Sequence, residues 1–234
     1  MRREGTIGFR DVILDAIVPA RRAVARHASG NPDGFLGQVR GVIHIGANLG
    51  QERFRDRRLG LEVLWIEPIP SVFEGLQRNI RVLPGQRAVR ALVTDTDGRG
   101  HDFHIASNDG ASSSIHALKR SLEIWPRVHF VDTMHIESVT LLRRERIDSA
   151  RSQALVLDTQ GSERLVLHGA ASLLGGIRFV KVEAYDLELY EGRCRRSDIS
   201  AYLGSQGSEE IRHTPFAGRA GDGTCYDVVF RRRA

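Results

Sequence analysis

The hydrophobic positions of this chain form short continuous runs that alternate with amphipathic segments. The runs have the length of strands and are apolar throughout, which is typical of strands buried on both faces of a parallel sheet. We therefore expect strands at residues 41–46, 61–67, 88–93, 154–158, 178–183 and 224–230, and helices at about 9–28, 50–59, 71–81 and 198–203 and around 165–167. This alternation predicts an α/β fold, with a mostly parallel sheet covered by helices on both faces.

The alternation weakens between residues 100 and 150. We expect a short strand at 101–105, one or two strands within 128–142, and between them a polar, flexible loop at 107–115. The chain then divides into an N-terminal helical extension (1–40) and one α/β domain (41–234), in which residues 100–150 form an insertion that covers a ligand.

Composition limits the class of protein and its partners. With 234 residues, 41% of them hydrophobic, the chain is long enough for a globular domain with a substantial core. The net charge of +5 comes from basic residues scattered among acids, as at 55–58, so we expect no nucleic-acid surface. No apolar run reaches the roughly 18–20 residues of a membrane span, and the N-terminus lacks a signal-peptide pattern. Cys194 and Cys225 have no metal-type spacing, which favours a reducing, cytoplasmic location.

A glycine-containing turn follows the first expected strand. Gly46 and Gly50 flank Ala47 and Asn48, and these residue types tolerate positive φ and let a ligand approach the backbone. Glu67 follows Gly46 by 21 residues, close to the spacing at which a βαβ nucleotide fold places a carboxylate on a ribose. The turn lacks the second glycine of a dinucleotide loop and contains no basic residue. A nucleoside ligand without phosphates fits better, and S-adenosylmethionine is the common one.

Polar residues also stand at the ends of the later strands. Asp158 ends one apolar strand and Glu183 ends another. In doubly wound sheets, ligands bind outside the carboxyl ends of the strands, where the 46–50 turn and Glu67 also fall. We therefore expect one site at this edge of the sheet.

Six segments, in this order, resemble the FkbM family of S-adenosylmethionine-dependent methyltransferases, and the resemblance extends from about Val42 to the C-terminus. They are IGANLGQE (45–52), IEPIPSVFEGLQRNI (66–80), SNDGASSSI (107–115), LVLDTQGSERLVLHGA (155–170), VKVEAYDLELYEG (180–192) and CYDVVF (225–230). The resemblance implies a class I methyltransferase (Rossmann-like) fold, with a seven-stranded sheet whose last strand is antiparallel. It also implies methyl transfer, usually to a hydroxyl oxygen. Two features depart from the family pattern. His44 stands where an acid generally helps to organise the methionine end of the cofactor, and it either changes cofactor binding or simply packs beneath the turn. Residues 139–142 lack the Asp of a Leu-Asp pair that often precedes the 154–158 strand, whereas Gln160 in place of a glutamate is a variant that the family also uses.

Together with this resemblance, the residues suggest a division of roles. In the cofactor group, the 46–50 turn contacts the methionine and ribose, Glu67 binds the ribose hydroxyls, and residues 94–95 lie against adenine. Asp158 is the first candidate for orienting the acceptor or taking its proton, and Glu183 and His116 are the second. The expected cofactor-binding residues are His44, Gly46, Ala47, Asn48, Gly50, Glu67, Pro68, Thr94, Asp95 and Asp158, and the expected acceptor-binding residues are Ser107, Asn108, Ser112, Ser113 and Ser114. No ligand cluster demands a metal, and we expect none.

Three functions stay open at this point. The first is O-methylation of a hydroxyl on a sugar, glycolipid or natural-product small molecule by S-adenosylmethionine. The others are an NAD-dependent oxidoreductase on the same fold and a non-catalytic S-adenosylmethionine-binding protein, for which His44 is the one hint. The expected partner is a small-molecule hydroxyl acceptor, with no nucleic acid and no membrane span, and a homodimer is left open.

Overall fold

The computed structural model describes residues 31–141, 151–186, 188–192, 194–219 and 223–233. The helix expected at 9–28, and with it most of the expected extension 1–40, lies outside these residues. The described part of that extension contains a short 3-10 helix, η1 (Gly34–Gln38).

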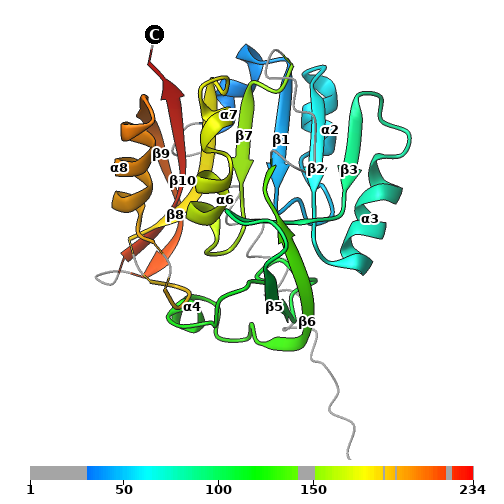
Figure 1. Ribbon diagram of the computed structural model, residues 1–234, viewed down its shortest axis with the longest axis vertical. Helices are drawn as coiled ribbons and strands as arrows, with labels where there is room; N and C mark the ends of the chain where they lie inside the picture. Colours follow the sequence, from blue (N-terminus) through cyan, green and yellow to red (C-terminus); the bar gives the residue numbers. More distant parts are fainter. Residues whose placement is uncertain (1–30, 142–150, 187, 193, 220–222, 234) are drawn as a thin grey trace, which may run out of the picture.

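The large sheet has seven strands in the order β3-β2-β1-β7-β8-β10-β9 (Figure 1). Strands from β3 to β8 pair in parallel, and β10 runs antiparallel to both of its neighbours. The expected seven-stranded sheet with an antiparallel last strand is therefore confirmed. The bounds are β1 Gly41–Ile45, β2 Glu62–Ile66, β3 Gln86–Val89, β7 Ala154–Leu157, β8 Phe179–Tyr185, β9 Ser208–Arg219 and β10 Gly223–Arg232.

Helices cover both faces of this sheet because successive strand residues point to opposite sides. In β1, Ile43 and Ile45 belong to an apolar cluster with residues of α6, α7 and α8, whereas Val42 belongs to a second cluster with residues of η1 and α3. The helices are α2 Arg53–Arg58, α3 Pro70–Ile80, α6 Glu163–Gly169, α7 Ala171–Leu174 and α8 Arg196–Ser205.

The strand expected at 88–93 is wrong as a single element. The chain leaves the large sheet after Val89, and β4 (Leu92–Val93) joins a small sheet of order β4-β6-β5 with β5 (Gly100–Ala106) and β6 (Phe130–Val139). Ala91 and Val93 pack in the same apolar cluster as α6 and α7. Burial against these helices, and not pairing with β2, thus directs this short apolar run.

A second difference concerns β9, which no apolar run predicted. Its sequence, SEEIRHTPFAGR, is polar and contains a proline. β9 lies at one edge of the sheet, and an edge strand tolerates both properties because one of its sides has no strand to pair with.

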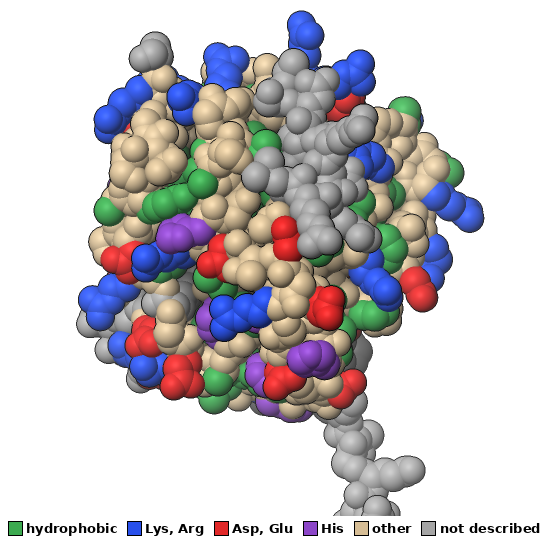
Figure 2. All heavy atoms as spheres, in the orientation of Figure 1, with side chains coloured by type: hydrophobic (Ala, Val, Ile, Leu, Met, Phe, Trp, Pro, Cys, Tyr) green, Lys and Arg blue, Asp and Glu red, His purple; other side chains and the backbone are tan. Residues whose placement is uncertain are grey.

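The small sheet lies below the carboxyl ends of β1, β2 and β7, together with α4 (Ser121–Ile124) (Figure 1). β5, α4 and β6, which belong to the segment expected as an insertion at 100–150, therefore lie at the strand ends (Figure 1). Lys and Arg side chains are spread over the visible face with acids among them, as the sequence suggested (Figure 2). Among the described helices, none is long and apolar enough to cross a membrane.

Candidate active site

The turn after β1 has three residues with positive φ: Gly46 (79°), Asn48 (45°) and Gly50 (67°). The backbone N–H groups of Gly46 and Ala47 both donate to the carbonyl oxygen of Ile66 at 3.0 Å, which fixes the turn against β2. A Cβ atom on Gly46 would lie 1.9 Å from the carbonyl oxygen of Asp158. Glycine is therefore required here by both the backbone angle and the close approach of β7.

Glu67 holds this turn from the end of β2. Its Oε2 accepts the backbone N–H of Asn48 and its Oε1 accepts the backbone N–H of Ile69, both at 2.9 Å. The side chain is 4% exposed, and burial raises its pKa to about 7, with a further contribution from Asp158. Each carboxylate oxygen accepts one backbone bond and has a second lone pair. Pro68, between Glu67 and Ile69 in the sequence, is buried as well.

His44 lies within the sheet, beneath the turn. On β1 it stands opposite Trp65 and Val156, and its ring centroid is 5.1 Å from that of Trp65. Burial lowers the pKa of His44, although the carboxylates of Glu52 and Asp158 act in the opposite direction. The imidazole is therefore a packed, neutral group at neutral pH.

The strand registers align four of the expected residues in one row. β1 pairs Ile45 with both Ile66 and Leu157, so Glu67, Gly46 and Asp158 follow at the same level of neighbouring strands. β7 pairs Leu157 with Val182, which adds Glu183 next to Asp158.

Glu183 lies inside β8 and not at its end, which corrects the expected strand boundary. The strand continues to Tyr185, whose hydroxyl donates to Glu183 Oε2 at 3.2 Å. Across the sheet, Glu183 faces Asp227 of β10, and Lys181 on the same face is 3.4 Å from Asp227 and 2.6 Å from Asp33. Glu183 thus ends the row on β8 and connects it to a buried polar group on β8 and β10.

Asp158 bonds to Gln160, and through Gln160 it is linked to Tyr190. Gln160, with a φ of 51°, donates from Nε2 to Asp158 Oδ1. The Tyr190 hydroxyl donates to Gln160 Oε1 at 2.7 Å. The backbone between Asp158 and α6 is fixed by Glu163, which is buried and accepts the N–H groups of Thr159 and Gly161.

The loop 107–115 bridges the two halves of this edge. On one side, Asn48 Nδ2 donates to the carbonyl oxygen of Asp109 at 3.1 Å. On the other side, Ser114 Oγ donates to the carbonyl oxygen of Gln160 at 2.7 Å, and the Tyr190 hydroxyl is 3.3 Å from the carbonyl oxygen of Ser112. The loop therefore crosses from the glycine turn to the segment after Asp158.

Most of the loop's own polar side chains bond within the insertion. Ser113 Oγ accepts the N–H of Ala106, Asn108 bonds Ser112 through both backbone and side chain, and Ser107 Oγ accepts the N–H of His129. These contacts order the loop, and an acceptor-binding role for Ser107, Asn108, Ser112, Ser113 and Ser114 stays a prediction.

His116 lies beside the segment that follows Asp158. A Cβ atom on Gly161, whose φ is 112°, would lie 3.2 Å from His116 Cδ2 and 3.3 Å from Tyr190 Cβ. The structure therefore places His116 near the row, although it was inferred only as a second candidate.

Thr94 and Asp95 follow β4 of the small sheet, and not β3 of the large sheet as expected. Thr94 is fully buried, and its carbonyl oxygen would be 2.1 Å from a Cβ atom on Gly169, the last residue of α6. The expected contact of these two residues with adenine stays a prediction.

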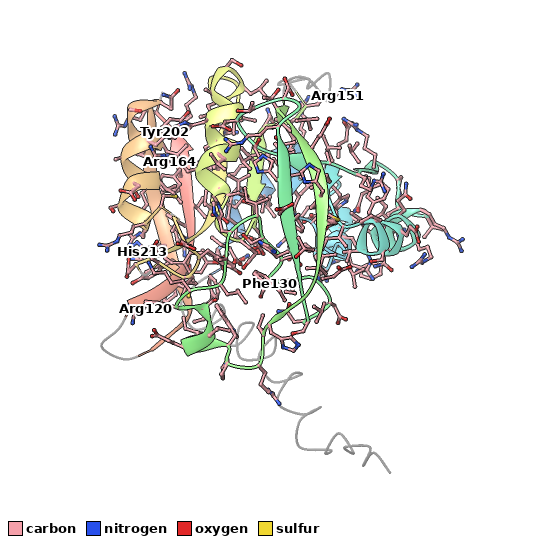
Figure 3. The ribbon with its side chains drawn as sticks, turned by 60° about the horizontal axis from the view of Figure 1, so that its bottom comes forward. Arg120, Phe130, Arg151, Arg164, Tyr202 and His213 are labelled. Atoms are coloured by element: carbon pink, nitrogen blue, oxygen red, sulfur yellow. The ribbon has the colours of Figure 1, made fainter. Side chains whose placement is uncertain are left out.

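Tyr190 and Glu163 were missed as site residues. Both occur in segments that carried the resemblance, but their partners, 30 and 4 residues away, are set by the fold and by a local turn. Figure 3 shows Arg120, at the start of α4, and Phe130 on β6 at the end of the molecule that carries the site, whereas Tyr202 on α8 and Arg164 on α6 lie away from it. Among the described residues, no group of three or more His, Cys, Asp and Glu side chains could hold a metal.

Comparison with known proteins agrees with this geometry. The sequence is 29% identical over 167 residues to the 2-O-methyltransferase NoeI of Sinorhizobium fredii, and the match covers 65% of this chain and 66% of that protein's length. The fold is similar to that of magnesium protoporphyrin IX methyltransferase from Synechocystis PCC 6803, with a TM-score of 0.50 and 12% identity over 99% of this chain and 87% of the other. Nothing in these relatives favours the oxidoreductase alternative. Residues 44–212 match the profile of the methyltransferase FkbM domain, so the chain belongs to the FkbM family of S-adenosylmethionine-dependent methyltransferases.

Proposed function

We propose that this protein transfers a methyl group from S-adenosylmethionine to a hydroxyl oxygen of a small acceptor, in the class of sugars, glycolipids or natural products. The observation that carries the proposal is the row of Glu67, Gly46 and Asp158 at the strand ends, crossed by the loop 107–115. The name of the relative NoeI supports a hydroxyl as the acceptor.

The residues of the turn fit the cofactor. The positive φ angles at Gly46, Asn48 and Gly50 leave the backbone open to a ligand, and no Lys or Arg is present within 46–50 to bind a phosphate. The carboxylate oxygens of Glu67 can accept hydrogen bonds from the two hydroxyls of a ribose. When bound, S-adenosylmethionine supplies an electrophilic methyl carbon on a sulfonium.

Asp158 has the central chemical role in this proposal. With cofactor and acceptor bound, the Asp158 carboxylate would take the proton of the acceptor hydroxyl as that oxygen replaces the sulfur on the methyl carbon. Because general-base catalysis contributes typically 10²- to 10⁴-fold, the rest of the acceleration comes from alignment of the two reacting atoms. The loop 107–115 and His116 contact the segment after Asp158, and in this proposal they hold the acceptor.

The test replaces Asp158 by asparagine. Asp158→Asn keeps an oxygen that can accept the Gln160 amide, so the fold and cofactor affinity should persist while turnover falls roughly 10²- to 10⁴-fold. Calorimetry with S-adenosylmethionine and release of S-adenosylhomocysteine over a panel of methyl glycosides and phenols measure the two properties. Unchanged turnover would remove Asp158 as the base. In the same preparation, S-adenosylmethionine and not NAD should raise the melting temperature.

Three further properties belong to this proposal. Activity should survive EDTA, and restoration by Mg²⁺ would contradict the expected absence of a metal. The cytoplasmic location rests on cysteine usage, and light scattering decides whether the protein is a homodimer.

A further inference from the structure

Three side chains form a directed hydrogen-bond chain that ends on Asp158. Tyr190 donates its hydroxyl to Gln160 Oε1 at 2.7 Å, and Gln160 donates its Nε2–H to Asp158 Oδ1. The three residues come from two separate segments, and the Tyr190–Gln160 contact spans 30 residues of sequence.

Tyr190 holds the far side of the Gln160 amide. The Asp158 carboxylate only accepts, so it takes the Nε2–H of Gln160, and the amide oxygen is left to accept the Tyr190 hydroxyl. Without the hydroxyl, the amide keeps its bond to Asp158 but loses the contact that fixes its position. Tyr190 therefore restrains the carboxylate through Gln160.

Tyr190 and Gln160 are both held in place by their surroundings. Tyr190 is 1% exposed and packs in an apolar cluster with Tyr185, Leu189 and Cys225. Gln160 has a φ of 51°, and its carbonyl oxygen accepts from Ser114 Oγ at 2.7 Å. A non-glycine residue in this backbone region is uncommon and persists where its surroundings fix it.

We propose that Tyr190 and Gln160 are positioning residues that orient the Asp158 carboxylate toward the acceptor hydroxyl. This inference rests on the proposed function, because it assigns these residues a part in the same methyl transfer. Neither residue receives the proton. They hold the carboxylate within the narrow range of positions in which proton removal coincides with attack on the methyl carbon, and misplacement by 1 Å can cost on the order of 10²-fold in rate.

Gln160 differs from the glutamate of the family pattern in that an amide does not titrate. A glutamate at position 160 would place a second carboxyl beside Asp158, and two adjacent carboxyls share a proton at intermediate pH. The activity of Gln160→Glu should therefore change with pH over a range in which the wild-type activity is level.

The first experiment compares Tyr190→Phe with Tyr202→Phe. Tyr202 on α8 donates to the carbonyl oxygen of Leu167 at 3.3 Å, so its replacement also removes a hydroxyl bonded to an oxygen, but away from the strand ends (Figure 3). With the most rapidly methylated member of the glycoside and phenol panel, Tyr190→Phe should lower kcat roughly 10- to 100-fold and leave the Kd for S-adenosylmethionine within about twofold. Tyr202→Phe should leave both unchanged. A normal kcat for Tyr190→Phe overturns the inference.

A double-mutant cycle separates positioning from general support of the fold. If Tyr190 acts through Asp158, adding Tyr190→Phe to Asp158→Asn should lower kcat no further, whereas a structural role would lower it by the same factor in both backgrounds. Additive losses therefore overturn the inference. If Tyr190→Phe does not fold, the changed pH profile of Gln160→Glu decides in its place, and a wild-type profile there contradicts the proposal.

The proposed function and this inference fail in different ways. A wild-type protein that releases no S-adenosylhomocysteine with any panel member contradicts the proposed function. An active wild type with an equally active Tyr190→Phe contradicts the positioning role alone.

Discussion

Replacement of Glu67 by glutamine should weaken cofactor binding and remove its pH dependence. Each carboxylate oxygen accepts one backbone N–H, from Asn48 and from Ile69, at 2.9 Å. Glutamine offers one oxygen, so its amide nitrogen faces one of these donors. A buried donor that loses its acceptor costs about 1–3 kcal/mol of stability. For this reason Glu67→Ala, which removes both acceptors, would disturb the turn itself, and the glutamine variant is the sharper test.

The effect on S-adenosylmethionine follows from the proposed bonds to ribose. A hydrogen bond to a charged group contributes about 1.5–3 kcal/mol, so losing one such bond lowers the affinity by roughly 10- to 150-fold. Burial raises the pKa of Glu67 to about 7, so wild-type affinity should rise between about pH 6 and 8 as the carboxylate ionises. The affinity of Glu67→Gln should be level over the same range.

Isothermal titration at several pH values measures both effects. Glu62→Gln is the matched control, because Glu62 begins the strand that Glu67 follows but is 55% exposed and 3.6 Å from the exposed Arg151. Surface pairs of this kind contribute little. Wild-type affinity and a retained pH dependence in Glu67→Gln would refute the ribose assignment, and equal losses in Glu62→Gln would show that the measurement reports the strand and not the site.

Two other predictions concern backbone geometry and acid stability. Gly46→Ala should lower the melting temperature far more than Gly60→Ala. Both glycines have positive φ (79° and 69°), but a Cβ on Gly46 would lie 1.9 Å from the Asp158 carbonyl oxygen, whereas one on Gly60 would meet nothing within 4 Å. Equal losses in thermal scans would contradict the close approach. His44 and Glu67 should make the free energy of unfolding depend on pH in opposite directions. Burial lowers the pKa of His44, so its contribution to stability is lost as the pH falls below about 6.5. The raised pKa of Glu67 makes the folded state bind its proton more tightly, so about 3 kcal/mol of stability is lost as the pH rises from 4.5 through 7. Urea titrations should therefore show stability falling less on acidification in His44→Gln than in wild type, and less on alkalinisation in Glu67→Gln.

The parts of the fold that sequence alone predicted are those in which burial acts on every residue. The strands around residues 61–67 and 154–158 carry apolar residues on both faces because helices cover both faces, so their ends, and with them Glu67 and Asp158, could be located. The polar strand β9 was not predicted, because an edge strand does not need a continuous apolar pattern. The apolar run at 88–93 was wrongly predicted to be one strand, because burial against α6 and burial in the sheet both require apolar residues.

The site was predictable where its chemistry follows the strand ends, and not where it depends on distant loops. The bond from Ser114 to Gln160 joins residues 46 apart, and that from Asn48 to Asp109 joins residues 61 apart. No local periodicity records such contacts. Tyr190 was missed for the same reason, since an isolated tyrosine in a segment of mixed polarity has no signal of its own.

Asn48 links the cofactor turn to the loop 107–115, and its two kinds of contact can be separated. Its backbone N–H bonds Glu67, whereas its side chain bonds the Asp109 carbonyl oxygen and the N–H of Leu49. Asn48→Gly keeps the backbone bond and tolerates the φ of 45°, so S-adenosylmethionine affinity should change only a few fold.

The loop should loosen in this variant, because the side-chain bond to Asp109 is lost while the bonds at Gln160 remain. Hydrogen exchange at the amides of 109–113 should accelerate, and the KM for the acceptor should rise more than the KM for S-adenosylmethionine. Asn79→Gly is not a suitable control, since Asn79 lies within α3, where glycine costs about 1 kcal/mol of helix stability. Gln51→Ala is better, because Gln51 bonds the same Asn48 side chain from an exposed position without reaching the loop. If exchange in the loop stays at the wild-type rate while cofactor affinity falls as far as in Glu67→Gln, Asn48 serves the cofactor alone, and the loop depends on its anchor at Gln160.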